Sequence, residues 1–321
     1  STSGLTTYTA MMLDPIATII DMSYIGRIPE ATLSLAGIGI SNTILNYFGF
    51  TFFFIVVTTT TTLAQTLATA AAAQGVALSE GVITEQTKAE GSKIIGNSLF
   101  VALCLGITSA LVAASFAPQL VGMIGSKESA GAVPYAVAYM RSKCLGIPAQ
   151  IAFFSLIGAY RGYRDLTTPL VASTFSSLCK VVLGYVFLFR LGLGVAGAGM
   201  ADTCAKYASV AVLLLLLVRD GRLRPADILV LPSRRRASEL LMPGGALTAR
   251  KLVEQLCFTA TTRLCSLYGT TAVAGTEICK QCWASASVLW WPLSVAGQTL
   301  VASALAERRA AAAAADPARA K

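Results

Sequence analysis

Residues 11–26, MMLDPIATIIDMSYIG, form the first long apolar run of the chain and contain two aspartates and a proline. A carboxylate inside hydrocarbon costs at least ~2.5 kcal/mol, so an aspartate in a membrane helix is usually functional. Asp14 and Asp21 are seven residues apart, which is about two helical turns and places them on one face. Pro15 removes a backbone hydrogen bond and favours a kink. We therefore expect a bent helix whose acidic face lines a polar cavity.

The composition is typical of a polytopic membrane protein. Of the 321 residues, 55% are hydrophobic and only 13% are charged, and the mean hydropathy is +0.67. Soluble domains contain about 25% charged residues. The net charge of +9 comes mainly from basic residues in short connections, as the positive-inside rule describes, and not from a stripe of Lys and Arg interleaved with aromatics. We expect the lipid bilayer as a partner, and no nucleic acid.

The absence of histidine argues against an enzyme and against a His-based metal site. A Ser-His or Cys-His nucleophile system cannot be assembled without it, and the chain has no phosphate-binding glycine loop. Cys279 and Cys282 have the spacing of a metal or redox pair, but they lie in an apolar run with no second pair. We interpret them as small membrane-buried side chains and expect neither a cofactor nor a metal.

We predict about eight transmembrane helices, because spanning a bilayer takes about 20 helical residues. The apolar runs cover 4–26, 33–58, 93–117, 133–158, 166–190, 194–218, 240–266 and 283–305. The connections alternate in basicity, and the richer set, which includes Arg234, Arg235 and Arg236, should face the cytoplasm or stroma. We place Lys143 with the less basic connections on the other side.

A weak internal repeat suggests two bundles. Tyr-Ile-Gly and Leu-Ala-Gly-Ile within 24–38 have counterparts in Leu-Tyr-Gly and Val-Ala-Gly within 267–275. We therefore predict an all-α membrane protein with a six-helix bundle over 1–219, a basic linker over 220–239, the first two helices of a second bundle over 240–305 and an alanine-rich tail over 306–321. Two complete bundles would need twelve helices, so we expect the sequence to be a fragment.

Three charged residues fall at similar depths in the predicted spans. At a rise of 1.5 Å per residue, Asp21, Lys180 and Asp202 lie about 8, 15 and 12 Å from the same membrane surface. We predict that they face one cavity and form a site for proton or cation coupling. Three simpler alternatives stay open: Asp21 lies at the interface, Lys180 snorkels towards it, and Asp202 pairs with Lys206 within one helix.

The same stretches resemble a known family. Residues 14–27 and 33–41 resemble the opening of the multidrug and toxic compound extrusion (MATE) transporters, most of all the plant branch of the DNA-damage-inducible-F type. Residues 159–170 resemble the family's loop after helix four, and 194–199 its entry to helix six. Residues 277–283 and 295–298 resemble helix eight of the plant branch. The resemblance covers essentially all eight predicted spans and is specific in combination.

The resemblance implies two six-helix bundles around a central cavity and an antiport of organic compounds against protons or sodium. Asp21 matches the family's helix-one aspartate, which is implicated in coupling. In helix five, Lys180 and Gly184 stand where the family has an asparagine and an aspartate. We hypothesise that Asp202 replaces the lost carboxylate and that the Lys180 ammonium takes the place of a bound cation. This arrangement favours protons over sodium as the coupling ion.

We expect polar residues from several spans to line a substrate cavity. Glu277 and Gln281 stand at the family's polar pair in helix eight, one turn apart on one face. Arg250 matches a basic position of the plant branch, or is a simple interfacial residue. The expected lining residues are Asp14, Asn46, Lys206, Arg250, Glu254, Glu277 and Gln281.

We therefore expect a secondary antiporter that exports organic ions or xenobiotics, with citrate-like anions among the candidates. We expect it to be a monomer in the plasma membrane or plastid envelope. One alternative is a lipid-linked flippase, which should have a markedly cationic cavity. The other is a transport-inactive truncated remnant. The mixed charges of the predicted cavity leave the substrate open among citrate-like anions, phenolics and cationic drugs.

Overall fold

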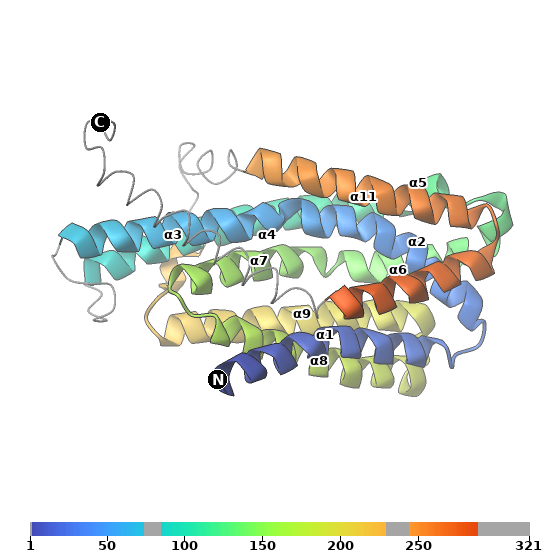
Figure 1. Cartoon of the computed structure of the whole chain (residues 1–321), viewed down its shortest axis with the longest axis horizontal. Coiled ribbons are helices and arrows are strands. Elements are labelled where there is room, and N and C mark those ends of the chain that lie inside the picture. The colour runs from blue at the N-terminus through green and yellow to red at the C-terminus, as the bar shows by residue number, and fades with distance from the viewer. Residues whose placement is uncertain (1, 74–84, 229–243, 288–321) are drawn as a thin grey trace, which may run out of the picture.

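The computed structural model describes residues 2–73, 85–228 and 244–287, and these ranges contain helices and no strand. The long helices lie along the long axis of the molecule (Figure 1). Four of the described helical runs are long and apolar enough to cross a membrane, and a fifth run qualifies if the bent pair α6 and α7 forms one span. An all-helical membrane protein is confirmed, but these runs alone do not establish eight spans.

The first two predicted spans correspond to three α-helices. α1 (Thr2–Ile25) contains Pro15, and α2 (Ala31–Phe50), η1 (Thr51–Phe53) and α3 (Phe54–Ala73) follow as one long helical run (Figure 1). The predicted span 33–58 is therefore too short, because the helix continues through a run of threonines. Their hydroxyls donate to carbonyls one turn earlier, as Thr60 Oγ1 does to Val56 O at 2.7 Å, which satisfies their polarity within the helix.

The middle of the chain contains a broken helix. α4 (Glu85–Ser115) begins before the predicted span 93–117 and is followed by the short helices α5 (Ala117–Ile124) and η3 (Lys127–Ala132). α6 (Val133–Cys144) and α7 (Ile147–Gly162) then cover the predicted span 133–158 and meet at an angle of 46°. α8 (Thr167–Tyr185), the π-helical η4 (Val186–Arg190) and α9 (Gly194–Arg219) agree with the next two predicted spans to within a residue at each end.

Close helix contacts hold α3, α4 and α7 together. A Cβ added to Gly158 would lie 2.8 Å from Val56 O, so only glycine lets α7 approach α3 this closely. Thr59 and Ser98 share a hydrogen bond of 2.6 Å across α3 and α4. Large apolar side chains such as Leu111 and Leu215 are exposed on the outside, as expected for helices that face lipid.

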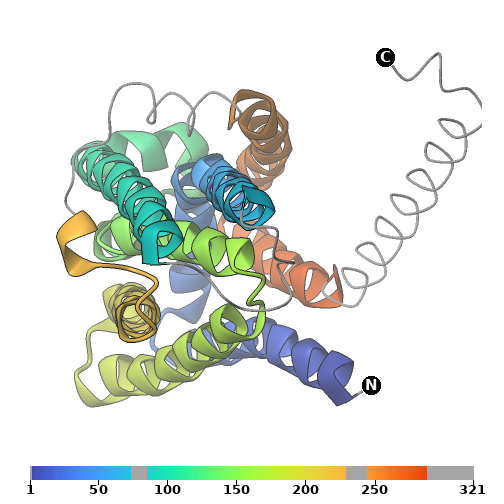
Figure 2. The same cartoon turned by 90° about the vertical axis from the view of Figure 1, so that its left-hand side faces the viewer.

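The last described part lies on one side of the bundle formed by α1 to α9 (Figure 2). It follows η5 (Pro225–Asp227) and comprises α11 (Gly244–Ser266) and a helix over 270–287. α11 agrees with the predicted span 240–266, and Tyr47 Oη of α2 lies 2.7 Å from Thr259 Oγ1 of α11. The predicted span 283–305 begins too late, since the helix already starts at residue 270. Residues 288–305, the predicted tail and much of the predicted linker lie outside the described residues.

Candidate functional site

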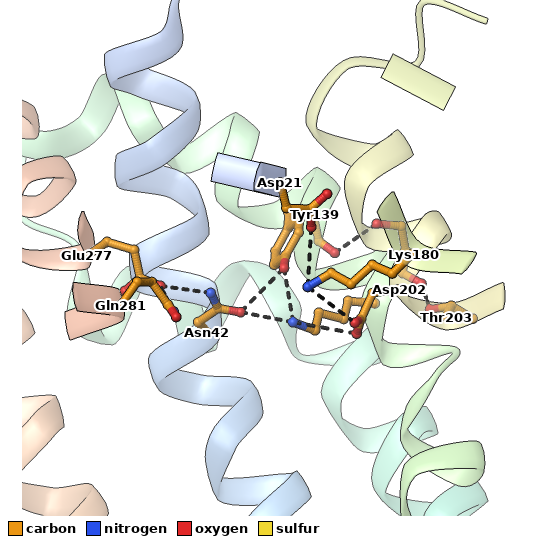
Figure 3. A network of polar contacts seen from close by, with 10 residues as sticks. Asp21, Asn42, Tyr139, Lys180, Asp202, Thr203, Glu277 and Gln281 are labelled. Atoms are coloured by element: carbon orange, nitrogen blue, oxygen red, sulfur yellow. Dashed lines mark hydrogen bonds and ion pairs between the residues drawn. The ribbon is translucent and has the colours of Figure 1, made fainter. Parts of the chain in front are cut away.

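A cavity of about 590 Å³ lies between the first bundle and the two helices that follow it. Its lining comes from α1, α2, α6, α7, α8, α9, α11 and the helix 270–287. This volume is within the range of small-molecule sites. Charged and amide side chains converge on it from both sides, and Figure 3 shows the polar network that crosses it. The network has two halves, which we describe in turn.

In the first half, one lysine lies between two aspartates. Lys180 Nζ of α8 is 3.3 Å from Asp21 Oδ2 of α1 and 3.7 Å from Asp202 Oδ1 of α9. The three side chains are only 11–17% exposed. The structure thus brings together the three residues whose depths in the membrane placed them in one layer, and Lys180 does not snorkel away from the two carboxylates. Buried charges need such partners, since desolvation of each ion costs several kcal/mol.

Gly184 lies directly beside this ion-paired group. It is one turn after Lys180 on α8, and a Cβ added to it would stand 2.9 Å from Asp21 Oδ1. Within the described residues, Asp21 Oδ1 is buried and accepts no hydrogen bond. Gly184, which the resemblance places at the family's helix-five aspartate, therefore provides space for the Asp21 carboxylate.

Lys143 joins the network and corrects our sequence-based placement of this residue in a connection. Its Nζ lies 3.7 Å from Asp202 Oδ2 and donates to Tyr139 Oη at 3.0 Å and to Asn42 Oδ1 at 3.2 Å. It is one turn after Tyr139, just before the break between α6 and α7. The available signal was its position inside the predicted span 133–158, which holds few other charges.

The second half is built around Glu277 of the helix 270–287, whose side chain is buried. Asn42 Nδ2 of α2 donates to Glu277 Oε1 at 2.9 Å, and Gln281 Nε2 donates to the same oxygen at 3.3 Å. Our sequence reasoning included Glu277 and Gln281 but missed Asn42. An amide in the apolar run 33–58 was the signal that could have found it.

Lys280 also lines the cavity, and its ammonium group contacts two hydroxyl groups. Its Nζ donates to Thr262 Oγ1 at 2.6 Å and to Thr43 Oγ1 at 3.4 Å. Thr262 donates to Phe258 O at 3.0 Å and Thr43 to Gly39 O at 2.9 Å, so the hydroxyl protons are already used and both oxygens can accept from the ammonium. This lysine was also missed by our sequence reasoning.

The remaining predicted cavity residues have different positions. Asn46, Lys206 and Glu254 line the cavity, and Lys206 Nζ lies 5.4 Å from the centre of the Phe153 ring. The described ion pairs of Asp202 are with Lys143 and Lys180, and the alternative of a pair with Lys206 within α9 is not among them, although the charge of Lys206 also acts on Asp202.

At the start of α11, the structure corrects the placement of Arg250. It is exposed and is not among the described lining residues, which include its neighbour Lys251 instead. Lys251 Nζ pairs with Glu254 Oε2 at 2.8 Å. A shift by one residue turns a helical side chain by about 100°, so Lys251 faces the cavity in its place. The side chain of Asp14 lies outside the described residues.

Comparisons with known proteins agree with this architecture. The MatE family model matches residues 88–186. Protein DETOXIFICATION 44, chloroplastic, from Arabidopsis thaliana is 28% identical over 295 residues, which cover 92% of this chain and 54% of the relative. Protein DETOXIFICATION 43 from the same plant is 27% identical over 340 residues, covering 93% of this chain and 64% of the relative. The chain thus spans between half and two thirds of the length of these relatives.

Solved structures show the same fold. The MATE multidrug transporter DinF-BH superposes with a TM-score of 0.75 at 16% sequence identity, covering 88% of this chain and 59% of that chain. At this identity the likeness supports the fold alone.

Proposed function

Because the chain belongs to the MATE family, in the plant and DinF-type branch, we propose that it exports organic ions in exchange for protons. It is an integral multi-pass membrane protein of the plastid envelope or plasma membrane. The observation that carries the proposal is the position of Lys180 Nζ, 3.3 Å from Asp21 and 3.7 Å from Asp202. We propose a monomer as the functional unit, because the described lining of the cavity comes from helices of this one chain.

The choice of protons over sodium rests on electrostatics. A sodium ion bound to Asp21 and Asp202 would have to share their oxygens with a covalently tethered ammonium. Two cations a few ångströms apart in a low-dielectric site repel each other by several kcal/mol. A proton needs no such space, since it adds to a carboxylate oxygen and removes its negative charge. Protonation of Asp21 or Asp202 would therefore weaken an ion pair between helices and provide a means of coupling.

The substrate class we propose is an organic anion such as a citrate-like carboxylate. The described lining contains Lys143 and Lys180, which have acidic partners, but also Lys206 and Lys280. Neither Lys206 nor Lys280 has a carboxylate within 4.0 Å among the described residues. Two ammonium groups that face a cavity and form no described ion pair within 4.0 Å favour a negatively charged ligand. The lining also contains four acids, so it is not the markedly cationic cavity of a flippase.

Transport in proteoliposomes tests the proposal. The protein is reconstituted, and uptake of radiolabelled citrate and of the cationic dye rhodamine 6G is measured under an imposed pH gradient or sodium gradient. We expect citrate transport driven by the pH gradient and unaffected by the sodium gradient. Lys180→Met and Asp202→Asn should each abolish the pH dependence. Sodium-driven transport, or unchanged pH dependence in both variants, would contradict the proposal.

A further inference from the structure

The two halves of the cavity network meet at a single side chain, Asn42, near the middle of α2. Its Nδ2 donates to Glu277 Oε1 at 2.9 Å on one side. On the other side, its Oδ1 accepts from Lys143 Nζ at 3.2 Å and from Tyr139 Oη at 3.4 Å. Figure 3 shows Asn42 between the helix that carries Glu277 and the group around Asp202. In the described structure, Asn42 therefore links the second half of the network to the first.

The charges on both sides fix the orientation of the Asn42 amide. A lysine ammonium can only donate hydrogen bonds, and an ionised carboxylate can only accept them. A flipped amide would point its NH₂ group at Lys143 and its carbonyl oxygen at Glu277, so both contacts would become repulsive. If Glu277 loses its charge, the hydrogen bond from Asn42 Nδ2 to Glu277 becomes weaker, the amide is less firmly oriented, and the hydrogen bond between Oδ1 and Lys143 weakens as well.

A chain of ion pairs connects Lys143 to the first half of the network, which contains Asp202, Lys180 and Asp21. Lys143 Nζ lies 3.7 Å from Asp202, and Asp202 shares Lys180 with Asp21. The other ionisable groups facing this path are Tyr139 beside Lys143, Lys206 one turn from Asp202, and Lys280 one turn from Glu277. A change at Glu277 can thus alter how strongly Lys143 is held by Asp202, and a change at Asp202 can act in the opposite direction.

We propose that Asn42 is a positioning residue that transmits the charge state of Glu277 to Lys143 and, through it, to Asp202. Its use in transport rests on the proposed function, but the link itself can be measured without transport. If Asn42 had only a structural role, it would fill space and form hydrogen bonds with its neighbours. The hydrogen bonding of Lys143 would then not change when Glu277 is changed. The two roles therefore predict different spectra.

Solid-state NMR of the protein labelled with ¹⁵N at lysine Nζ, in lipid vesicles, distinguishes these roles. Lys143→Arg identifies the Lys143 resonance by its loss. We expect Glu277→Gln to shift this resonance when Asn42 is present. In an Asn42→Leu background, which removes both the acceptor for Lys143 and the donor to Glu277, Glu277→Gln should leave it unchanged.

Asn46→Leu is the matched control, because Asn46 lies one turn further along α2, lines the same cavity and makes no hydrogen bond to the described residues. The Lys143 response to Glu277→Gln should persist in that background. The proposal would be overturned if the unmodified Asn42 protein gave no response. It would equally be overturned if the response were undiminished in the Asn42→Leu background.

The transport arm separates this inference from the proposed function. In proteoliposomes, Asn42→Leu should lower pH-driven citrate accumulation by at least about fivefold, the lower end of typical coupling between sites. If the unmodified protein moves neither citrate nor rhodamine 6G, the proposed function fails while the NMR result still decides the link. If transport is normal but the Lys143 resonance does not respond to Glu277, the link fails and the function stands.

Discussion

Gly184 and Asp21 fit against each other: a Cβ on Gly184 would stand 2.9 Å from Asp21 Oδ1, closer than non-bonded atoms allow. The space left by the missing side chain on α8 is thus occupied by a carboxylate from α1. Two residues of α8 therefore position the Asp21 carboxylate: Lys180 forms an ion pair with it, and Gly184 leaves the space that it occupies. Lys180 and Gly184, the two positions at which helix five departs from the pattern of the family it resembles, therefore both lie beside the Asp21 carboxylate.

We predict that Gly184→Ala destabilises the protein and weakens its transport. The added methyl group must displace the Asp21 carboxylate from its position beside Lys180, and overpacking of this kind typically costs about 1–3 kcal/mol. We expect a lower unfolding temperature in detergent, followed by circular dichroism, and weaker pH-driven transport. Gly275→Ala is the control, since a Cβ there meets no atom within 4 Å. Equal effects of the two substitutions would show that Gly184 has no special relation to Asp21.

Lys180→Met should destabilise the protein more than loss of an exposed ion pair. It leaves Asp21 without a described ion partner in a buried position, and removing one partner of a buried pair costs about 3–5 kcal/mol. The double variant Lys180→Met with Asp21→Asn removes the unpaired charge as well and should recover much of that loss. Unfolding temperatures of the two variants test this. A double variant no more stable than Lys180→Met alone would contradict the pairing.

The sequence predicted the first half of this site better than the second. Asp21, Lys180 and Asp202 could be placed together because the helical rise is constant, and depth along each apolar run then gives their level in the membrane. Lys143 was misplaced because its positive charge, two residues after Arg141, was assigned to a connection although the residue lies inside the predicted span 133–158. Residues whose positions depend on rotation about a helix axis were equally hard to predict, as the exchange of Arg250 for Lys251 shows.

The missed residues of the second half share a physical reason. Asn42, Thr43 and Thr262 are neutral side chains in apolar helices, and nothing in their own sequence neighbourhood marks them as partners of a charge. Their function arises from long-range contacts, such as that of Asn42 with Glu277, which are 235 residues apart. The hydropathy pattern predicts where the helices lie in the sequence. It does not predict which side chains of two distant helices come within hydrogen-bond distance of each other.

Asp165 leads to a prediction about pH, outside the membrane-spanning helices. Its Oδ1 accepts from the backbone N–H groups of Thr167 and Thr168 at the start of α8, at 3.1 and 3.0 Å. Partial burial by itself would raise the pKa of Asp165, but the hydrogen bonds from Thr168 and Thr167 and the charge of Arg222 outweigh it and lower the pKa from its usual 3.8. A carboxyl whose pKa is lowered by folding stabilises the folded state while it is ionised.

The stabilisation by Asp165 should therefore be complete above its unfolded pKa and decrease as pH falls through the lower folded value. Asp165→Ala should cost about 0.5–2 kcal/mol near neutral pH, the usual range for losing a helix cap. The difference in unfolding temperature from the unmodified protein should shrink below about pH 4. Glu90→Gln, an exposed change in α4, should show no such trend. A difference that grows on acidification would refute the assigned role.

Thr262 should be important because it accepts the shortest described hydrogen bond of Lys280, at 2.6 Å. Thr262→Val keeps the shape of the side chain and removes the acceptor, which leaves the half-buried ammonium with Thr43 Oγ1 at 3.4 Å. Loss of such a partner costs about 1–3 kcal/mol. We therefore expect a clear fall in unfolding temperature for Thr262→Val.

The adjacent Thr261→Val is the matched control for this change, because Thr261 is exposed and donates only to Cys257 O within its own helix among the described residues. Its unfolding temperature should change little. Because the Lys280 ammonium would be less firmly positioned without Thr262, Thr262→Val should also weaken citrate uptake more than rhodamine 6G uptake. An equal loss of citrate uptake and of rhodamine 6G uptake would show that Lys280 has no specific role in binding the anion.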